Sequence, residues 1–150
     1  MKIKNIISSK VITINQNATY KEAAFILYQN KISGAPVVDD KGNLVGMLSE
    51  KDLFKCLYPY EKSYSAHPDQ YLDFENRENK TNEIENHKVN TFMIKEVITI
   101  SGDTPVLKAG GLMLAKGIHR LPVIEDGKII GIVSRDDIFG RVFKNQFHWE

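Results

Sequence analysis

The chain has 150 residues, of which 42% are hydrophobic and 26% charged, and its formal net charge at pH 7 is +1. This composition is typical of a globular protein with its own core, and the near-zero charge argues against nucleic acid as a partner. No apolar run is long enough to cross a bilayer, and the N-terminus lacks a signal-peptide pattern, so we expect a cytoplasmic protein with no membrane contact. The single cysteine, Cys56, rules out an internal disulfide.

The first 57 residues predict the order strand, helix, strand, strand, helix. Thr19, followed three positions later by Glu22, resembles a capping box at the start of the first helix, whose apolar face is expected at 23–27. A hairpin turn at 39–43 joins the two later strands, and Ser49 begins the second helix. The expected elements are a strand at 11–14, a helix at 20–30, strands at 35–38 and 44–48, and a helix from 49 onward.

A segment of different character, 58–90, comes next. It begins with the helix-breaking run Tyr58-Pro59-Tyr60 and is otherwise polar, with little apolar face. We interpret it as a partly helical insert outside the core. Two interpretations of its aromatic residues remain open: they tie a solvated excursion to its own domain, or they form a lid or docking surface. These aromatic residues are Tyr58, Tyr60, Tyr64, Tyr71 and Phe74.

The pattern of the first half returns about 86 positions later, which indicates an internal duplication. The segments 11–14, 31–38 and 46–53 return as 97–100, 117–124 and 131–138. In the second copy, Asp103-Thr104-Pro105 predicts a cap and a proline in the first helical turn. Gly110-Gly111 falls inside that helix, where glycine is unfavourable, and this suggests close approach of another backbone such as a partner helix.

Two copies of one supersecondary unit can bury their apolar faces on each other about a pseudo-twofold axis. The expected fold class is therefore α+β, with two repeats of β-α-β-β-α order and with function in the clefts between them. The predicted divisions are a first repeat at 1–57, the insert at 58–90, a second repeat at 91–143 and a C-terminal tail at 144–150. Phe147 and Trp149 are apolar residues at a chain end, which favours packing on a second subunit over packing within the chain.

One motif, Gly-apolar-apolar-Ser-x-x-Asp, opens the second helix of each copy. Ser49 and Ser134 can cap the helix, and Asp52 and Asp137 can occupy its first turn, near the positive end of the helix dipole. Alternatively, each carboxylate accepts hydrogen bonds from two neighbouring hydroxyls, as an acidic residue does when it binds a ribose. The motif alone does not decide between these roles.

A second candidate pair, His119 and Arg120, stands where the first copy has Ser33 and Gly34. A guanidinium beside an imidazole is suited to clamp a phosphate, and Ile118 is placed to cover a planar ring. The alternatives are a packing histidine and a surface ion pair. The four histidines lack metal-ligand spacing, and there is no glycine-rich phosphate loop or nucleophile motif, so we expect neither a metal site nor catalysis.

Taken together, the matched segments resemble a pair of cystathionine-β-synthase (CBS) domains, an arrangement called a Bateman module. The resemblance covers both copies and leaves out only the insert and the tail. It implies an α+β intramolecular dimer whose clefts bind adenosine compounds such as AMP, ADP, ATP or S-adenosylmethionine, and it implies association of two modules into a homodimer. Members of the family regulate enzymes, channels or transporters, or stand alone, and we expect a stand-alone protein of bacterial type here.

The resemblance also implies site residues. Asp52 and Asp137 would grip ribose hydroxyls, with Ser49 and Ser134 bonding nearby atoms. The contributors from elsewhere are Val97, Ile118, His119 and Arg120 for the cleft that holds Asp52, and Ile12, Ser33 and Ala35 for the cleft that holds Asp137. Because only the second copy carries the His-Arg pair, the Asp52 cleft is expected to bind phosphate better.

The expected function is a regulatory module that binds an adenine nucleotide, shifts between two arrangements and acts on an unidentified partner without catalysis. No cofactor is required, and S-adenosylmethionine is the alternative ligand. The competing interpretation is a module that binds no ligand and serves only to dimerise and to dock a partner protein.

Overall fold

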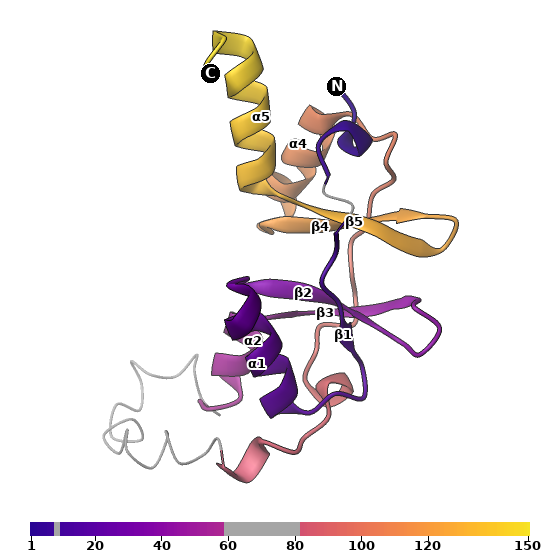
Figure 1. Cartoon of the computed structure of the whole chain (residues 1–150), viewed down its shortest axis with the longest axis vertical. Helices are drawn as coiled ribbons and strands as arrows, with labels where there is room; N and C mark the ends of the chain where they lie inside the picture. Colours follow the sequence, from indigo (N-terminus) through magenta and orange to yellow (C-terminus); the bar gives the residue numbers. More distant parts are fainter. Residues whose placement is uncertain (8–9, 59–81) are drawn as a thin grey trace. The chain divides into compact units, whose positions relative to one another are not determined.

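A computed structural model describes residues 1–7, 10–58 and 82–150, which divide into two compact units (Figure 1). The first-repeat unit comprises Thr13–Lys41 and Val45–Glu96. The second-repeat unit comprises Met1–Ile12, Gly42–Leu44 and Val97–Glu150. Each unit follows one of the two sequence repeats, with additions from elsewhere in the chain.

The first-repeat unit contains a three-stranded sheet with two helices on one of its faces (Figure 1). Its elements are β1 (Ile14–Asn15), α1 (Tyr20–Asn30), β2 (Gly34–Val38), β3 (Leu44–Ser49), α2 (Glu50–Lys55) and the 3-10 helix η4 (Val89–Thr91). The strand order is β1-β2-β3, and β1 runs parallel to β2 with Ile14 opposite Val37. The predicted order of strands and helices in the first repeat is therefore confirmed, but the first strand is Ile14–Asn15 and not 11–14.

Helix α1 has the bounds that the sequence predicts. The Thr19 side chain accepts a hydrogen bond from the Glu22 backbone N–H, and Lys31 ends the helix in the left-handed conformation at φ 54°. Ala23 and Leu27, one turn apart, are buried against the sheet, as an amphipathic helix requires. The expected apolar face was too broad, because Phe25 points to solvent and is 57% exposed.

Close packing fixes one glycine in this unit. A Cβ added at Gly46 would lie 2.6 Å from the Met93 sulfur and 2.8 Å from the Ile94 carbonyl oxygen. Next to it, Met47 and Ile94 exchange two backbone hydrogen bonds of 2.9 Å each. Position 46 therefore has no room for a side chain unless this pairing opens.

The second-repeat unit has two helices on one face of a two-stranded sheet (Figure 1). Its elements are η1 (Ile3–Asn5), α4 (Val106–Lys116), β4 (Arg120–Glu125), β5 (Lys128–Ser134) and α5 (Arg135–Phe147). Strands β4 and β5 are antiparallel. The expected strand at 97–100 is wrong as a strand, because only Ile100 pairs, in a single parallel bridge to Val123.

Helix α5 is longer than predicted. It has 13 residues and continues through Phe147, four positions into the expected tail, whereas its first-repeat equivalent α2 has only six. The Gly110-Gly111 pair lies inside α4 as expected, but no backbone atom of the described residues comes within 4 Å of a Cβ added at either glycine. The suggested close approach is therefore not made inside the described chain.

The segment before each repeat packs in the unit of the other repeat. Residues 1–12, which precede the first repeat, belong to the second-repeat unit, and η4, which precedes the second repeat, belongs to the first-repeat unit. In the second-repeat unit, the backbone N–H of Ile3 donates to the Thr104 carbonyl at 2.9 Å. In the first-repeat unit, the N–H of Val89 donates to the Ala18 carbonyl at 2.8 Å. Ile3 and Val89 are fully buried, each in the core of its unit.

This arrangement corrects the interpretation of 58–90 as an insert outside the core. Ile84 and Val89 are both buried, so the end of that segment is a structural part of the first-repeat unit. The segment's polar character hid this, because a single buried residue in a 3-10 turn produces no periodic apolar pattern. Most of the aromatic cluster lies outside the described residues.

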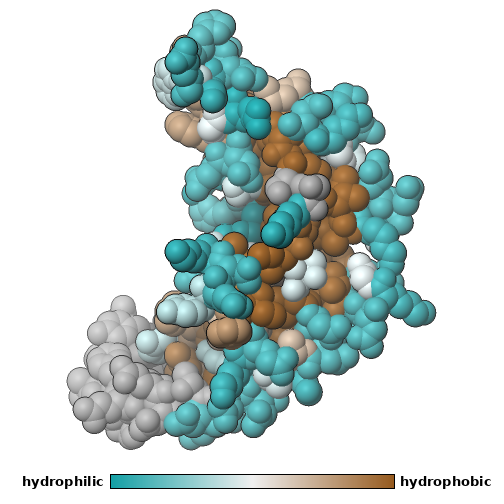
Figure 2. Space-filling view, viewed as in Figure 1, coloured by the Kyte–Doolittle hydropathy of each residue, from teal (hydrophilic) through white to brown (hydrophobic). Residues whose placement is uncertain are grey.

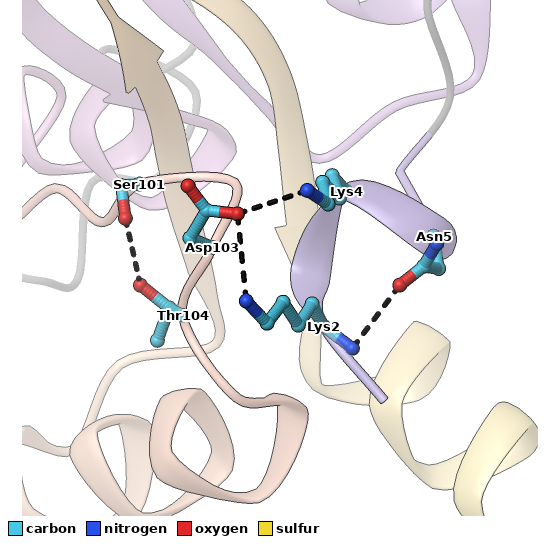
Figure 3. A network of polar contacts seen from close by, with 6 residues as sticks. All are labelled: Lys2, Lys4, Asn5, Ser101, Asp103 and Thr104. Carbon is cyan, nitrogen blue, oxygen red and sulfur yellow. Dashed lines mark hydrogen bonds and ion pairs between the residues drawn. The ribbon is translucent and has the colours of Figure 1, made fainter.

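Ion pairs on the surface also hold the N-terminal segment (Figure 3). The ammonium groups of Lys4 and Lys2 lie 3.0 Å and 3.7 Å from Asp103 Oδ1. The hydrogen bond from Lys4, followed by the charges of both lysines, lowers the pKa of the Asp103 carboxyl. The side-chain cap predicted from Asp103-Thr104-Pro105 is not formed, because Pro105 itself is the N-cap residue of α4 and no side chain caps the helix.

Candidate functional site

The Ser-x-x-Asp motif of the first repeat forms a complete capping box at the start of α2. The Ser49 backbone N–H and hydroxyl donate to Asp52 Oδ2 at 2.8 Å and 3.0 Å, and the Asp52 N–H donates to Ser49 Oγ at 3.4 Å. The serine satisfies an unpaired helix donor, and the carboxylate lies near the positive end of the helix. The structural role predicted for both residues is confirmed.

The second repeat builds the same box at the start of α5. The Ser134 N–H donates to Asp137 Oδ2 at 2.8 Å, and the Asp137 N–H donates to Ser134 Oγ at 3.1 Å. The two aspartates differ in burial: Asp52 is 7% exposed, whereas Asp137 is exposed to solvent.

Both boxes leave one carboxylate oxygen unused. Every hydrogen bond that the carboxylates of Asp52 and Asp137 accept from the described residues ends on Oδ2. Among the described residues, no buried side-chain oxygen or nitrogen lacks a hydrogen-bond partner, so Oδ1 of Asp52 reaches the surface. Capping and ligand recognition are therefore compatible, because each uses a different oxygen.

A backbone hydrogen bond joins the second candidate segment to the capping box in each unit. The Ser33 carbonyl accepts from the Glu50 N–H at 2.9 Å, and the His119 carbonyl accepts from the Arg135 N–H at 2.8 Å. Arg120 lies opposite Ser134 in the β4–β5 register. The structure therefore brings each candidate segment to the capping box of its own repeat.

The other candidate residues differ in exposure. Ala35 is buried, which argues against a direct side-chain contact in this conformation. Ile12, Val97 and Ile118 are half-buried apolar residues, and His119 is exposed. Figure 2 shows hydrophobic side chains gathered over the strands of Figure 1, while hydrophilic side chains cover much of the other visible surface.

The implied clefts combine residues of both units. Asp52 and Ser49 belong to the first-repeat unit, whereas His119 and Arg120 belong to the second-repeat unit. Ser33 and Ala35 lie in the first-repeat unit, and Asp137 in the second. The two cleft assignments stay predictions.

Sequence reasoning missed a groove between α1 and α2. Its volume is about 950 Å³, and most of its lining is apolar. The lining residues are Tyr20, Ala24, Leu27, Tyr28, Gln29, Lys31, Ile32, Ser33, Glu50, Leu53, Phe54 and Leu57. No local motif in the sequence marks this groove.

The cysteine lies close to this groove and to the capping box. Cys56 Sγ donates to the Asp52 carbonyl at 3.4 Å, and burial, with a smaller effect of Asp52, raises the pKa of the thiol. Tyr20 donates from its hydroxyl to the Leu53 carbonyl at 2.8 Å, and burial raises its pKa as well. Both groups stay neutral at pH 7, so their role here is packing.

The described residues contain no group of three or more histidine, cysteine or acidic residues that could hold a metal ion. No helix in the described ranges has the length and apolar character needed to span a bilayer.

Comparison with known proteins identifies the family. The model of the CBS domain matches residues 3–59 and 89–144. A CBS domain-containing protein of Dictyostelium discoideum is 32% identical over 143 residues, which cover 95% of this chain and 91% of the relative. An uncharacterised protein of Methanocaldococcus jannaschii is 32% identical over 151 residues, with 92% and 89% covered.

Solved structures agree with this assignment. One similar structure is the CBS domain pair of protein MJ0100, in complex with 5′-methylthioadenosine and S-adenosyl-L-methionine. Its TM-score is 0.70 and its sequence identity 26%, and the match covers 97% of this chain and 98% of the MJ0100 chain. CBSX2 from Arabidopsis thaliana has a TM-score of 0.78 and 23% identity over 97% and 96%, and CBSX2 is also known in complex with AMP.

Some longer relatives are enzymes. The A-adding tRNA nucleotidyltransferase of Aquifex aeolicus is 28% identical, but the match covers only 14% of its length. With both repeats matched by the same family model and with the fold of solved CBS pairs, this chain belongs to the CBS domain family as a tandem pair of CBS domains.

Proposed function

We propose that this CBS pair is a regulatory module that binds an adenosine compound, without catalysing a reaction on it. The observation that carries the proposal is the unused Oδ1 of Asp52 and Asp137 at the two capping boxes. A carboxylate oxygen at the first turn of a helix is a strong acceptor for a ribose hydroxyl. The complex of the MJ0100 pair with two adenosine compounds supports this ligand class.

The finer proposal is an adenine nucleotide: AMP, ADP or ATP. Arg120 and His119 supply a guanidinium and an imidazole next to the Ser134 capping box, and such nitrogen donors suit phosphate. S-adenosylmethionine is the alternative ligand, because it carries the same adenosine group without a phosphate. The proposed ligand-binding residues are Ile12, Ser33, Ala35, Ser49, Asp52, Val97, Ile118, His119, Arg120, Ser134 and Asp137.

Ligand binding would regulate through its unequal affinity for two conformations of the pair, and the output would pass to a partner protein or to a second copy. We place this activity in the cytoplasm, where adenine nucleotides are available. Because the side chain of Ala35 is buried, this residue can contribute to the site only through its backbone.

Thermal unfolding tests the proposal. A ligand that binds only the folded state raises the midpoint with its concentration, so the protein is heated with AMP, ADP, ATP, S-adenosylmethionine or buffer alone. Asp52→Asn and Arg120→Ala are expected to abolish the nucleotide shift. Asp136→Asn and Arg141→Ala remove matching charges from exposed positions on α5 and are expected to keep it.

The outcomes separate the candidates. A shift with nucleotides that is lost in Arg120→Ala supports phosphate recognition, whereas a shift with S-adenosylmethionine that survives Arg120→Ala supports the non-phosphate ligand. No shift with any compound at millimolar concentration would refute ligand binding. The docking module would then be the better candidate, and the exposed apolar residues on α1, α4 and α5 favour it as the second function.

A further inference from the structure

The leading segment of each repeat is held by the same pattern of backbone hydrogen bonds. Residues 1–4 lie antiparallel to 102–106, which we name the second cradle, and residues 87–90 lie antiparallel to 16–20, the first cradle. In the second cradle the N–H groups of Ile3, Lys4 and Val106 donate to the carbonyls of Thr104, Gly102 and Met1 at 2.9, 2.9 and 3.0 Å. In the first cradle the N–H groups of Val89, Asn90 and Tyr20 donate to the carbonyls of Ala18, Gln16 and His87 at 2.8, 3.0 and 2.7 Å. Each pair is displaced by 86 positions from its counterpart, so the backbone does not distinguish the two segments.

Chain length favours docking of each leading segment on its own repeat. Ile3 is 101 positions from Thr104 but only 15 from Ala18, the counterpart of Thr104 in the first cradle. Because the probability of closing a loop falls with about the 3/2 power of its length, the local pairing has an advantage of about 17-fold. Val89 has the same choice, since it lies 71 positions from Ala18 and 15 from Thr104. Side chains must therefore direct each segment to the cradle of the other repeat.

One selecting feature is a charge in the second cradle. The Lys4 ammonium lies 3.0 Å from Asp103 Oδ1 (Figure 3). The counterparts of these two residues in the first-repeat unit are Asn90 and Asn17, which carry no charge. Local docking would separate Lys4 from Asp103 and lose the ion pair. An exposed ion pair changes an equilibrium by up to about fivefold, so this feature offsets part of the advantage of the short loop.

The other selecting feature is the size of the buried side chain. Ile3 and Val89 are both fully buried, each in the core of its unit, and they differ by one methylene group. Local docking would put the isoleucine where the valine fits and would leave a small cavity where the isoleucine was. The lost methylene costs about 2–12-fold, and the overpacking costs about fivefold or more. Together with the ion pair, these factors are large enough to outweigh the short loop.

We propose that Asp103 and Ile3 select the leading segments: the second cradle binds an extended segment in which isoleucine lies between two lysines, and the first cradle rejects it. The second cradle is thereby an interaction surface of defined specificity, filled by the chain's own N-terminal segment. The two repeats exchange their leading segments because of these side chains and not because of their backbone hydrogen bonds. This selection does not depend on ligand binding.

Disulfide trapping in the full chain tests the selection. In a Cys56→Ser chain, Lys2→Cys with Pro105→Cys reports docking in the second cradle, because these two residues are bridge partners. Lys2→Cys with Thr19→Cys reports docking in the first cradle, because Thr19 is the bridge partner of Lys88, the counterpart of Lys2. The chains are refolded from urea with oxidised glutathione, and the internal disulfide is measured by mass spectrometry of peptides. The native side chains are expected to give mainly the second-cradle disulfide.

Exchange of the selecting side chains is expected to redirect the segment. A chain that carries Asp103→Asn, Asn17→Asp, Ile3→Val and Val89→Ile should form the first-cradle disulfide as the major product. Asp103→Asn alone should lower the ratio of second-cradle to first-cradle disulfide by about two- to fivefold, the contribution of an exposed ion pair. Asp136→Asn removes the same charge from an exposed position of α5 and should leave the ratio unchanged.

Two results would overturn the selection. One is an exchanged chain that still forms only the second-cradle disulfide, and the other is an Asp103→Asn chain with the ratio of the native side chains. Every chain keeps Lys4, the closer partner of Asp103. Circular dichroism confirms that each variant is folded. If the exchanged chain does not refold, the Asp103→Asn chain decides, because that change affects only an exposed side chain.

Discussion

The two capping boxes allow a matched test of how burial changes the contribution of a hydrogen-bonded carboxylate to the free energy of unfolding. Asp52→Ala removes the acceptor of two hydrogen bonds, from the N–H and the hydroxyl of Ser49, at a residue that is 7% exposed. Hydrogen bonds to charged groups contribute about 1.5–3 kcal/mol, and a donor left unsatisfied costs about 1–3 kcal/mol. We expect a loss of about 2–3 kcal/mol in the free energy of unfolding, since the Ser49 hydroxyl can turn toward water.

Asp137→Ala is the control, because it breaks the same box in solvent. The Ser134 N–H gains water in place of the carboxylate, so the loss is that of an exposed cap, about 0.5–1 kcal/mol. Urea unfolding followed by circular dichroism measures both variants. In thermal unfolding the midpoint of the Asp52 variant should fall by about 4–12 °C, because 1 kcal/mol shifts the midpoint of a chain of this size by about 2–4 °C. Equal losses, or a larger loss for Asp137→Ala, would refute the argument from burial.

The remaining predictions concern packing and pH. Gly46→Ala should lower the free energy of unfolding by about 1–3 kcal/mol, because the added Cβ meets a backbone carbonyl. Gly111→Ala, whose Cβ meets nothing within 4 Å, should raise the free energy of unfolding by up to about 1 kcal/mol. Urea titrations measure both, and a gain in stability at Gly46 would contradict the described pairing of Met47 and Ile94. Ile3→Ala removes a fully buried side chain and should cost about 2–5 kcal/mol of the free energy of unfolding, and Val89→Ala should also destabilise the protein. Hydrogen exchange should show the loss of protection in the second-repeat unit for Ile3→Ala and in the first-repeat unit for Val89→Ala. The reverse assignment would refute the described packing. Because the pKa of Asp103 is lowered, its contribution to the free energy of unfolding is present above its usual pKa of about 3.9 and is lost as the pH falls through the lowered value. Asp103→Asn should therefore flatten the acid side of a plot of stability against pH. An unchanged plot would count against the ion pair.

Local signals in the sequence predicted the elements that local chemistry controls. The start of α1 follows from the Thr19 cap, and the helix starts at Ser49 and Ser134 follow from their side chains. The bridge at Ile100 shows the limit of this reasoning, since a β-branched run predicts an extended backbone but not how many of its residues find a partner strand.

Features that depend on distant residues left no local pattern. The burial of Val89 and Ile3 comes from backbone contacts with segments far along the chain. The different exposure of Asp52 and Asp137 cannot be predicted from identical motifs, because neighbouring elements determine it. The groove beside α1 is lined by residues from two separate helices, α1 and α2, and a motif search does not detect such a combination.

The exchange of leading segments between the repeats has a consequence for how the protein is made. Lys4 and its partner Asp103 are 99 positions apart, so the segment that carries Lys4 must wait on the ribosome until its docking site has been made. At about 5–20 residues per second, that wait is about 5–20 s. The first-repeat unit is completed by η4, which comes directly after the first repeat and the segment that follows it in the chain, so this unit can finish folding earlier. During synthesis the second-repeat unit should therefore become resistant to protease after the first-repeat unit, although its segment 1–12 is translated before the first repeat.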